Sequence, residues 1–248
     1  MPQNPSLAVS VIVPVYNEEG AAVQVAREIE SVFSKAYGAD GYEIVMVDDR
    51  SSDLSFPRLT ELKKDLPTLR VLRHEKNAGK SAAIRSGIMA ARSDIVVTLD
   101  GDGQNPPADA ARMAAILRAA GPEVGLVAGQ RRNRQDTASK KWASRWANGI
   151  RKKLLNDNCD DTACGLKAIR RDLFLRLPFF DQLHRYLPAL VNREGYQTLI
   201  EIVDDRARTT GQSKYTNIGR LAVALTDLPG VMWLNRRLRR PGAVSEAE

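Results

Sequence analysis

The chain has 248 residues, which is enough to bury a substantial core as one large domain or two small ones. Its formal net charge of +7 and its pI near 9.5 favour anionic partners such as nucleic acid, a phospholipid surface or a phosphorylated substrate. Cys159 and Cys164 cannot build a disulfide framework, and their spacing without a nearby histidine is poor for zinc. No uncharged apolar stretch reaches membrane-spanning length, so we expect a cytoplasmic protein that is soluble or lies on a membrane without crossing it.

Apolar segments typical of buried strands alternate with segments of helical periodicity over roughly the first half of the chain. The predicted strands cover residues 7–16, 42–47, 69–73, 95–99 and 124–128. Helices are expected from Asn17 to near Gly38, from the Lys80 region through Ala91, and over 108–119. Asn17 can cap the first helix, with Glu18 and Glu19 at its positive end. The alternation predicts an α/β fold with right-handed crossovers and a mainly parallel sheet flanked by helices.

The most informative stretch follows the fourth predicted strand, where Asp100 and Asp102 are separated by one glycine. Ligands of open α/β sheets bind outside the carboxyl ends of the strands. Gly101 lets the chain turn so that both carboxylates can face one ion, and such ligands suit Mg²⁺ or Mn²⁺ that also binds phosphate oxygens. The alternative is a polar turn with aspartates in turn positions. An EF-hand is excluded, because Asn105 stands where that loop needs glycine.

Other polar clusters follow the remaining predicted strands and should meet the same edge of the sheet. Carboxylates after the second strand can bind a base edge or ribose hydroxyls, although Asp48 can equally cap the following turn. Lys80 after Gly79 resembles a phosphate loop, yet a Walker A motif needs glycine where His74 stands. No G-x-G-x-x-G follows the first strand, which disfavours dinucleotide oxidoreductases. The absence of G-x-S-x-G gives hydrolase triads little support.

The second half of the chain is more basic, and we expect it to pack onto the sheet, with a further strand at 198–203. A group of cations either binds phosphate or forms a solvated face: Arg131, Arg132, Arg134, Lys140, Lys141 and Arg145. His184 and Arg185 either contact a substrate or lie on the surface before a helix. Residues 217–240 mix apolar runs with arginines, so this extension either lies at a membrane interface or docks on the core. Residues 241–248 are expected to form a disordered tail.

Six motifs in order resemble those of family 2 glycosyltransferases with the GT-A fold, a Rossmann-like architecture. They are V-P-V-Y-N-E at 13–18, V-D-D-R-S-S-D at 47–53, N-A-G-K at 77–80, D-G-D-G-Q at 100–104, D-T-A-C-G at 161–165 and G-Q-S-K-Y at 211–215. The last two resemble the dolichol-phosphate mannosyltransferase-like, polyprenyl-phosphate branch. Arg50 and Ala163 depart from this pattern, since glycine is usual at both positions.

This resemblance implies a single catalytic domain over residues 6–216 that inverts the anomeric centre. It implies transfer of a hexose from a nucleotide-diphosphate sugar, such as GDP-mannose or a UDP-sugar, to dolichyl or undecaprenyl phosphate, for modification of cell-envelope glycan or lipopolysaccharide. The enzyme would act on the inner face of the cytoplasmic membrane, with a downstream integral membrane transferase or flippase as a further partner. The alternatives are transfer to a sugar or polysaccharide acceptor, and a basic nucleic-acid-binding protein. The nucleic-acid alternative lacks any recognition motif.

The resemblance also assigns roles to individual residues. The metal, Mg²⁺ or Mn²⁺, and the donor phosphates would be bound by Asp100, Asp102 and Gln104, and Asp161 is the candidate base or acceptor-orienting group. Phosphate groups would be bound by Arg131, Arg145, Ser213 and Lys214. The catalytic candidates are Asp161, Asp102, Arg131 and Lys214. The remaining nucleotide- or substrate-binding candidates are Pro14, Tyr16, Glu18, Asp48, Asp49, Lys80 and Arg185.

Overall fold

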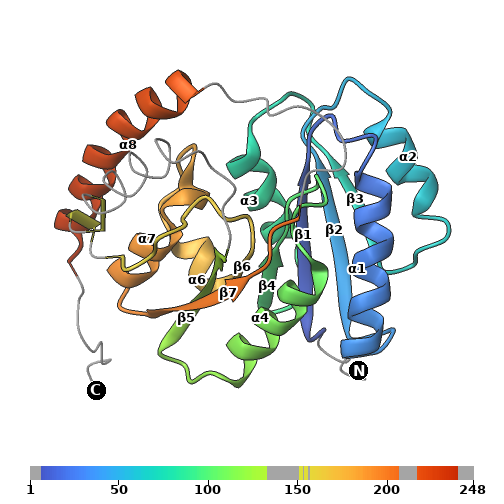
Figure 1. Cartoon of the computed structure of the whole chain (residues 1–248), viewed down its shortest axis with the longest axis horizontal. Coiled ribbons are helices and arrows are strands. Elements are labelled where there is room, and N and C mark those ends of the chain that lie inside the picture. Colours follow the sequence, from blue (N-terminus) through green and yellow to red (C-terminus); the bar gives the residue numbers. More distant parts are fainter. Residues whose placement is uncertain (1–6, 133–150, 153, 156, 207–216, 240–248) are drawn as a thin grey trace, which may run out of the picture.

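The structure is a computed structural model that describes residues 7–132, 151–152, 154–155, 157–206 and 217–239, with backbone alone for 217–225. In this part of the chain a seven-stranded sheet has the order β3-β2-β1-β4-β6-β5-β7, with helices on both of its faces (Figure 1). The strands are β1 (Val9–Val15), β2 (Tyr42–Asp48), β3 (Leu69–Arg73), β4 (Ile95–Thr98), β5 (Val124–Arg131), β6 (Lys167–Arg170) and β7 (Gln197–Val203).

The helices connect and cover these strands in the order expected of an α/β fold. They are α1 (Ala22–Tyr37), α2 (Ser55–Leu62), α3 (Lys80–Ala90), α4 (Pro107–Ala119), α6 (Arg171–Arg176), α7 (Leu187–Arg193) and α8 (Asn217–Arg237), with a short 3-10 turn, η1 (Leu183–Arg185). The expected α/β class and mainly parallel sheet are therefore confirmed. The helix α2 was not expected from the sequence.

The sheet is parallel except at one strand. β1 pairs in parallel with β2 and β4, β2 pairs in parallel with β3, and β5 pairs in parallel with β7. The exception is β6, which lies antiparallel between β4 and β5. β6 was not expected, because its four residues begin with Lys167 and end with Arg170 and give no strand-length apolar run.

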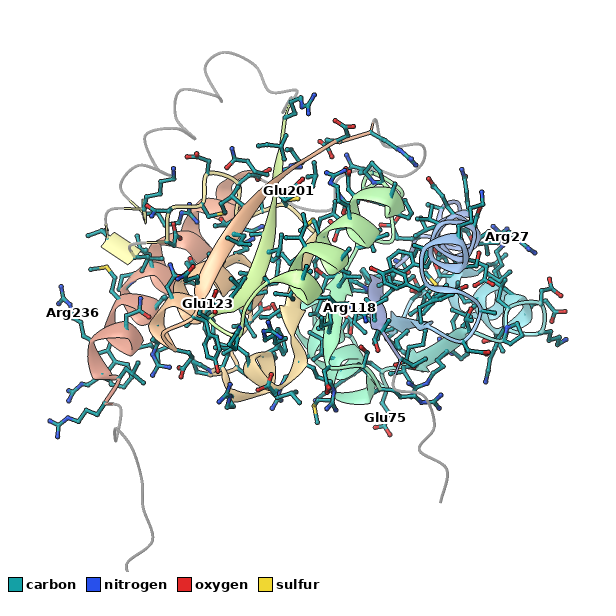
Figure 2. All side chains as sticks on the ribbon, turned by 90° about the horizontal axis from the view of Figure 1, so that it is seen from below. Arg27, Glu75, Arg118, Glu123, Glu201 and Arg236 are labelled. Carbon is teal, nitrogen blue, oxygen red and sulfur yellow. The ribbon has the colours of Figure 1, made fainter. Side chains whose placement is uncertain are left out.

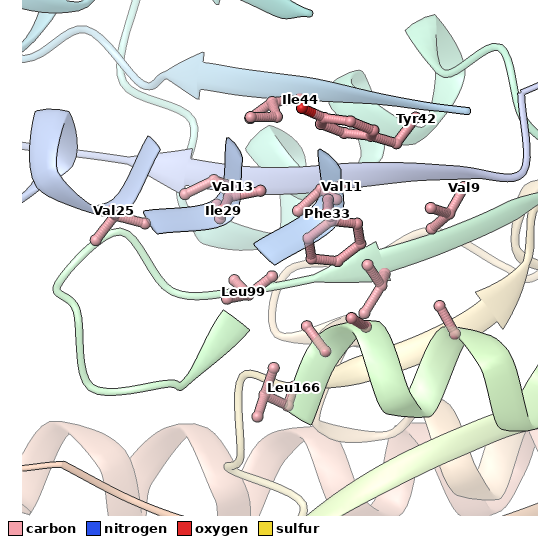
Figure 3. Packing of buried hydrophobic residues seen from close by; sticks show 14 of the residues in the cluster. Val9, Val11, Val13, Val25, Ile29, Phe33, Tyr42, Ile44, Leu99 and Leu166 are labelled. Atoms are coloured by element: carbon pink, nitrogen blue, oxygen red, sulfur yellow. The ribbon is translucent and has the colours of Figure 1, made fainter. Parts of the chain in front are cut away.

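Two separate cores cover the two faces of the sheet, because alternate strand residues point to opposite faces. On one face Val11 and Val13 of β1 pack with Ile29 and Phe33 of α1, as Figure 3 shows. On the other face Ile12 of β1 packs in a second cluster with residues of α3, α6 and α7. The central strands are buried on both sides, as their continuous apolar runs predicted.

The first helix begins later than the sequence suggested. Asn17 has a left-handed backbone, with φ 52°, and α1 starts only at Ala22 with no side-chain cap. The Asn17 Oδ1 instead accepts a hydrogen bond of 2.8 Å from the backbone N–H of Ser52. The predicted capping role of Asn17 is therefore wrong, because its side chain serves a contact between two loops. Arg50 is the other left-handed residue in these loops, with φ 64°.

The C-terminal helix docks on the body of the protein over its last turns. Val231 is buried, and Leu228 and Met232 pack against the second core cluster. The Arg193 Nε donates to the carbonyl oxygen of Leu234 at 3.2 Å, which ties α7 to the end of α8. No helix in the described part of the chain is both long enough and apolar enough to cross a membrane.

A buried carboxylate at the amino-terminal edge of the sheet offers a test of this architecture. Glu43 Oε1 accepts hydrogen bonds from Ser10 Oγ at 2.7 Å and from the Arg92 backbone N–H at 2.6 Å, and Oε2 accepts from Arg70 at 2.6 Å. We predict that Glu43→Ala lowers the free energy of unfolding by about 3 kcal/mol, because several donors then lose their buried acceptor. Urea unfolding measures this change. Glu61→Ala, which removes an exposed carboxylate, should change stability little.

Candidate active site

The carboxyl ends of β1, β2 and β4 meet at one edge of the sheet, which is the upper edge in Figure 1. The loops after β1 and β2 are joined to each other by hydrogen bonds between backbone N–H groups and side chains. Asn17 N–H donates to Ser51 Oγ at 2.9 Å, and Glu18 N–H donates to Ser55 Oγ at 2.8 Å. This pairing builds a fixed rim beside the strand ends. Two predicted nucleotide-binding residues lie on it: Tyr16 is 40% exposed, and Glu18 is partly buried. The third, Pro14, is partly buried near the end of β1.

Asp48, the last residue of β2, has no solvent-exposed surface. Its two carboxylate oxygens accept from the Ser51 backbone N–H at 3.3 Å, and Arg73 Nε lies 3.2 Å from Oδ2. Of the two roles considered for Asp48, the structure supports the turn cap, because the carboxylate is enclosed by protein groups.

Asp49 fixes the loop that precedes α3. Its Oδ1 accepts from the Ala78 N–H at 2.8 Å, its Oδ2 accepts from the Gly79 N–H at 2.8 Å, and His74 Nδ1 lies 2.7 Å from Oδ1. The Asn77 side-chain amide also donates to the Asp49 carbonyl oxygen at 3.0 Å. Asp49 therefore links the end of β2 to the start of α3 and so sets the position of Lys80.

Lys80 and Asp100 form the central ion pair of the site. The Lys80 Nζ donates to Asp100 Oδ1 at 2.6 Å, and about a quarter of each side chain is exposed (25% and 27%). Burial acts to raise the pKa of Asp100, but Lys80, Lys167 and Arg131 lower it more, so the net pKa lies below its usual value. Asp100 therefore stays ionised at neutral pH.

Gly165 allows the loop after residue 160 to approach Asp100 closely. A Cβ placed on Gly165 would lie 2.4 Å from Asp100 Oδ1, well inside van der Waals contact. The Gly165 carbonyl oxygen also accepts a 2.6 Å hydrogen bond from Thr98 Oγ1, in the strand that leads to Asp100. The D-T-A-C-G motif therefore packs directly behind the first aspartate of D-G-D, although the two motifs are far apart in the sequence.

Asp102 and Gln104 continue the same loop. Asp102 is 6% exposed, and its Oδ1 accepts from the Gln104 N–H at 3.1 Å. The Gln104 carbonyl accepts from the Arg206 N–H at 2.9 Å, so the loop is held against the chain after β7. Asp100 and Asp102 provide hard carboxylate ligands that fit Mg²⁺ or Mn²⁺. Among the described residues no group of three or more His, Cys, Asp or Glu could hold a metal.

Arg131 at the end of β5 is paired with two carboxylates. Its Nε and one terminal nitrogen contact the two oxygens of Asp161 at 2.6 and 3.0 Å, and Asp205 lies 3.7 Å from the other nitrogen. Burial lowers the pKa of Arg131, but Asp161 raises it more, so the net pKa lies above its ordinary value. The two candidate catalytic residues Arg131 and Asp161 are thus in direct bidentate contact.

Of two further polar groups beside this site, sequence reasoning missed Lys167 and expected His184 either to contact a substrate or to lie on the surface. Lys167 is buried, with its Nζ donating to the carbonyl oxygens of Thr162 and Cys164, and burial lowers its pKa. His184 Nδ1 lies 2.7 Å from Ser81 Oγ, and burial with the nearby Lys80 and Lys167 holds its pKa well below the usual value. No local signal marked Lys167, because the four residues of β6 give no strand-length apolar run. The Ser81–His184 contact joins residues too distant in the sequence to be inferred.

Of the remaining predicted site residues, one lies within the part of the chain that the structure describes. Arg185 is partly buried in η1, next to His184. Arg145, Ser213 and Lys214 lie outside the described residues, as do Arg134, Lys140 and Lys141. The two cysteines are buried and unpaired, and burial raises the pKa of Cys164 to about 11, so its thiol stays protonated.

Comparison with known proteins gives consistent similarities. Residues 10–177 match the family model described as glycosyl transferase family 2. The chain is 33% identical over 89% of its length to an undecaprenyl-phosphate 4-deoxy-4-formamido-L-arabinose transferase of Pseudomonas fluorescens, and spans 63% of that relative's length. It is 30% identical over 96% of its length to a dodecaprenyl-phosphate galacturonate synthase of Rhizobium johnstonii, spanning 70% of that relative.

Solved structures share the fold at lower sequence identity. Glucosyl-3-phosphoglycerate synthase from Mycobacterium tuberculosis, in complex with Mn²⁺, UDP and glucosyl-3-phosphoglycerate, is 19% identical with a TM-score of 0.65, covering 94% of this chain and 81% of that one. The mannosyltransferase PcManGT from Pyrobaculum calidifontis, in complex with GDP-Man and Mn²⁺, is 21% identical with a TM-score of 0.62, covering 97% and 68%. These matches support the GT-A fold expected from the sequence.

The contact between Gly165 and Asp100 leads to a prediction about metal binding. In Gly165→Ala the new Cβ would displace the Asp100 carboxylate, which is the nearest group to it. We expect Mn²⁺ affinity, measured by electron paramagnetic resonance with UDP or GDP present, to fall about tenfold or more, as for other changes behind metal ligands. Gly230→Ala is the matched control, because nothing lies within 4 Å of its added Cβ. Unchanged Mn²⁺ affinity in Gly165→Ala would contradict the assignment of Asp100.

Proposed function

The chain belongs to glycosyl transferase family 2, and we propose that it transfers a sugar from a nucleotide-diphosphate sugar to a polyprenyl phosphate. The observation that carries this proposal is the arrangement of charge at one edge of the sheet. There Asp100 of the D-G-D motif pairs with Lys80, and Lys167 and Arg131 lower the pKa of the same carboxylate. This mixture suits a divalent cation together with phosphate oxygens of two substrates. The acceptor class is inferred from two relatives whose names describe polyprenyl-phosphate sugar transfer.

The donor end of the site would bind the metal and the diphosphate. Asp100 and Asp102, with Gln104, would hold Mg²⁺ or Mn²⁺, which supplies Lewis-acid stabilisation of the leaving nucleoside diphosphate. Tyr16 and Glu18, on the rim formed by the two joined loops, would contact the base and ribose. Asp49 would act indirectly, by positioning the loop that precedes α3, because its carboxylate oxygens already accept hydrogen bonds from that loop.

The acceptor end would use Arg131 and Asp161. A guanidinium matches the oxygens of a phosphate group, so an incoming acceptor phosphate would take Arg131 in exchange for Asp161. Asp161 would then orient the acceptor at the reacting centre. Strong basicity is not required, because a phosphomonoester with a second pKa of about 6 is already anionic near neutrality. Attack from the side opposite the leaving diphosphate would invert the anomeric centre. Positioning and charge stabilisation would supply most of the rate.

An acceptor of this kind lies in a membrane, and the end of α8 has features of an interfacial anchor. Trp233 is 58% exposed, and the Arg237 guanidinium lies 5.5 Å from its ring centroid. Arg236 and Arg237 are exposed, and Arg236 points away from the body of the protein in Figure 2. An exposed indole with arginines suits the anionic cytoplasmic leaflet, where each cation contributes about 1 kcal/mol. These features support the proposal that the enzyme acts on the inner face of the membrane.

The direct test is a transfer assay with purified protein. Labelled nucleotide sugars, Mn²⁺ or Mg²⁺ and undecaprenyl phosphate are incubated, and label in the lipid fraction is counted. Sugar transfer that is indifferent to added lipid phosphate would instead indicate a sugar or polysaccharide acceptor. Failure with every donor sugar would contradict the proposed reaction.

Asp102→Asn tests the metal-binding role within that assay. The substitution removes one charge from the metal shell while keeping the shape of the side chain, so we expect transfer to fall at least about 100-fold with an unchanged melting temperature. Asp65→Asn is the control, because Asp65 is exposed and pairs with Arg27 away from the site. Full activity of Asp102→Asn would remove Asp102 from the metal site.

The membrane contact is tested separately by vesicle flotation. Arg236→Glu should weaken binding to vesicles of phosphatidylcholine with phosphatidylglycerol, because it reverses a charge beside the exposed Trp233. Arg27→Glu makes the same change at the opposite end of the molecule in Figure 2 and should bind like the unchanged protein. Equal loss in both variants would indicate a general charge effect and contradict an anchor at the end of α8.

A further inference from the structure

The Lys80 ammonium group occupies Asp100 Oδ1, a carboxylate oxygen that would otherwise be available to a metal ion. Lys80 Nζ lies 2.6 Å from Asp100 Oδ1, and each side chain keeps about a quarter of its surface in solvent (25% and 27%). Partial burial reduces screening of this ion pair by water, so the attraction between the two side chains is stronger than on an open surface. The exposed quarter of each side chain leaves room for a ligand to replace one partner. Lys80 is the first residue of α3, and its flexible four-carbon stem can move while the Asp49-bound loop stays in place.

The surroundings of Asp100 are positively charged beyond this one contact. Lys167 and Arg131 also lower the pKa of the Asp100 carboxylate. Lys167 is buried at the first position of β6. A divalent cation that arrives alone therefore meets an occupied carboxylate and unfavourable charge. A nucleoside diphosphate is attracted by the same lysines. Among the described residues no third His, Cys, Asp or Glu joins Asp100 and Asp102 in a group that could hold a metal.

We propose that Lys80 makes metal binding and donor binding interdependent by exchanging partners. In the absence of donor, Lys80 neutralises Asp100 and competes with the metal for Oδ1. When the diphosphate binds, the Lys80 ammonium moves onto a phosphate oxygen and Asp100 becomes a metal ligand. No covalent bond changes in this exchange, and the charges stay balanced, because the diphosphate replaces Asp100 as the partner of Lys80. This inference rests on the proposed function, since it takes the donor to be a nucleotide-diphosphate sugar.

The exchange has a thermodynamic consequence that does not depend on turnover. If the donor raises metal affinity by a given factor, the metal must raise donor affinity by the same factor. Removing the Lys80 charge should raise the affinity for Mn²⁺ alone, because the competing cation is gone. It should lower nucleotide affinity, because a phosphate ligand is lost. An ordinary loss of a binding residue would not improve metal binding.

The experiment measures Mn²⁺ binding to the full chain by electron paramagnetic resonance, first without nucleotide and then with UDP or GDP. We expect Lys80→Met to bind Mn²⁺ alone about tenfold more tightly than the unchanged protein. We also expect the enhancement of Mn²⁺ binding by nucleotide to shrink. Lys80→Arg keeps the cation and should retain the weak nucleotide-free binding. Lys76→Met removes the same charge from the exposed part of the same loop and should change neither quantity.

Each outcome has a defined meaning. Equal or weaker Mn²⁺ binding by Lys80→Met, in protein that melts at the same temperature as the unchanged chain, would overturn the exchange. Equal gains in Lys80→Met and Lys76→Met would also overturn it, because the effect would then be general electrostatics. Failure of both UDP and GDP to bind with Mn²⁺ would count against the proposed function. The nucleotide-free comparison would still decide whether Lys80 and the metal compete for Asp100.

Discussion

The constraint that governs this molecule is the internal pairing of opposite charges at the carboxyl edge of the sheet. Lys80 holds Asp100, and Arg131 holds Asp161, each through contacts of 2.6 Å at the closest. An unpaired charge in a partly buried site is costly. Here each of these charges has a neighbour of opposite sign. Under the proposed function, binding would proceed by exchange between neighbours and would leave no buried charge isolated.

The antiparallel strand β6 is the structural device that brings the two pairs together. β6 lies between β4 and β5, and the loop that precedes it brings Gly165 beside the end of β4. Gly165 lies against Asp100, while Asp161 reaches Arg131 at the end of β5. A purely parallel connection would leave these loops on separate parts of the edge. The single reversal of direction therefore brings the two charge pairs together from distant segments.

The sequence predicted the regular elements better than it predicted their contacts. The strands β1 to β5 were recognisable from their apolar residues, and β2 and β4 lead directly to carboxylates. The roles of Asn17 and Asp48 depended on contacts with Ser52 and Arg73, which local patterns do not encode. The helix α2, the strand β6 and the Ser81–His184 contact were missed for the same reason. Short elements and pairs far apart in sequence are fixed by tertiary packing, which overrides local propensity.

One backbone feature at the rim of the site bears on how this protein could be made more resistant to heat. Arg50 adopts a left-handed conformation, with φ 64°, in the loop joined to the one after β1. For a residue with a Cβ this conformation costs about 1 kcal/mol, and glycine avoids that cost. The folded chain thus carries a conformational cost next to the candidate site, outside its close-packed cores. Engineering for higher thermal stability would begin with glycine at position 50, and would reveal whether contacts of the Arg50 guanidinium compensate for that cost.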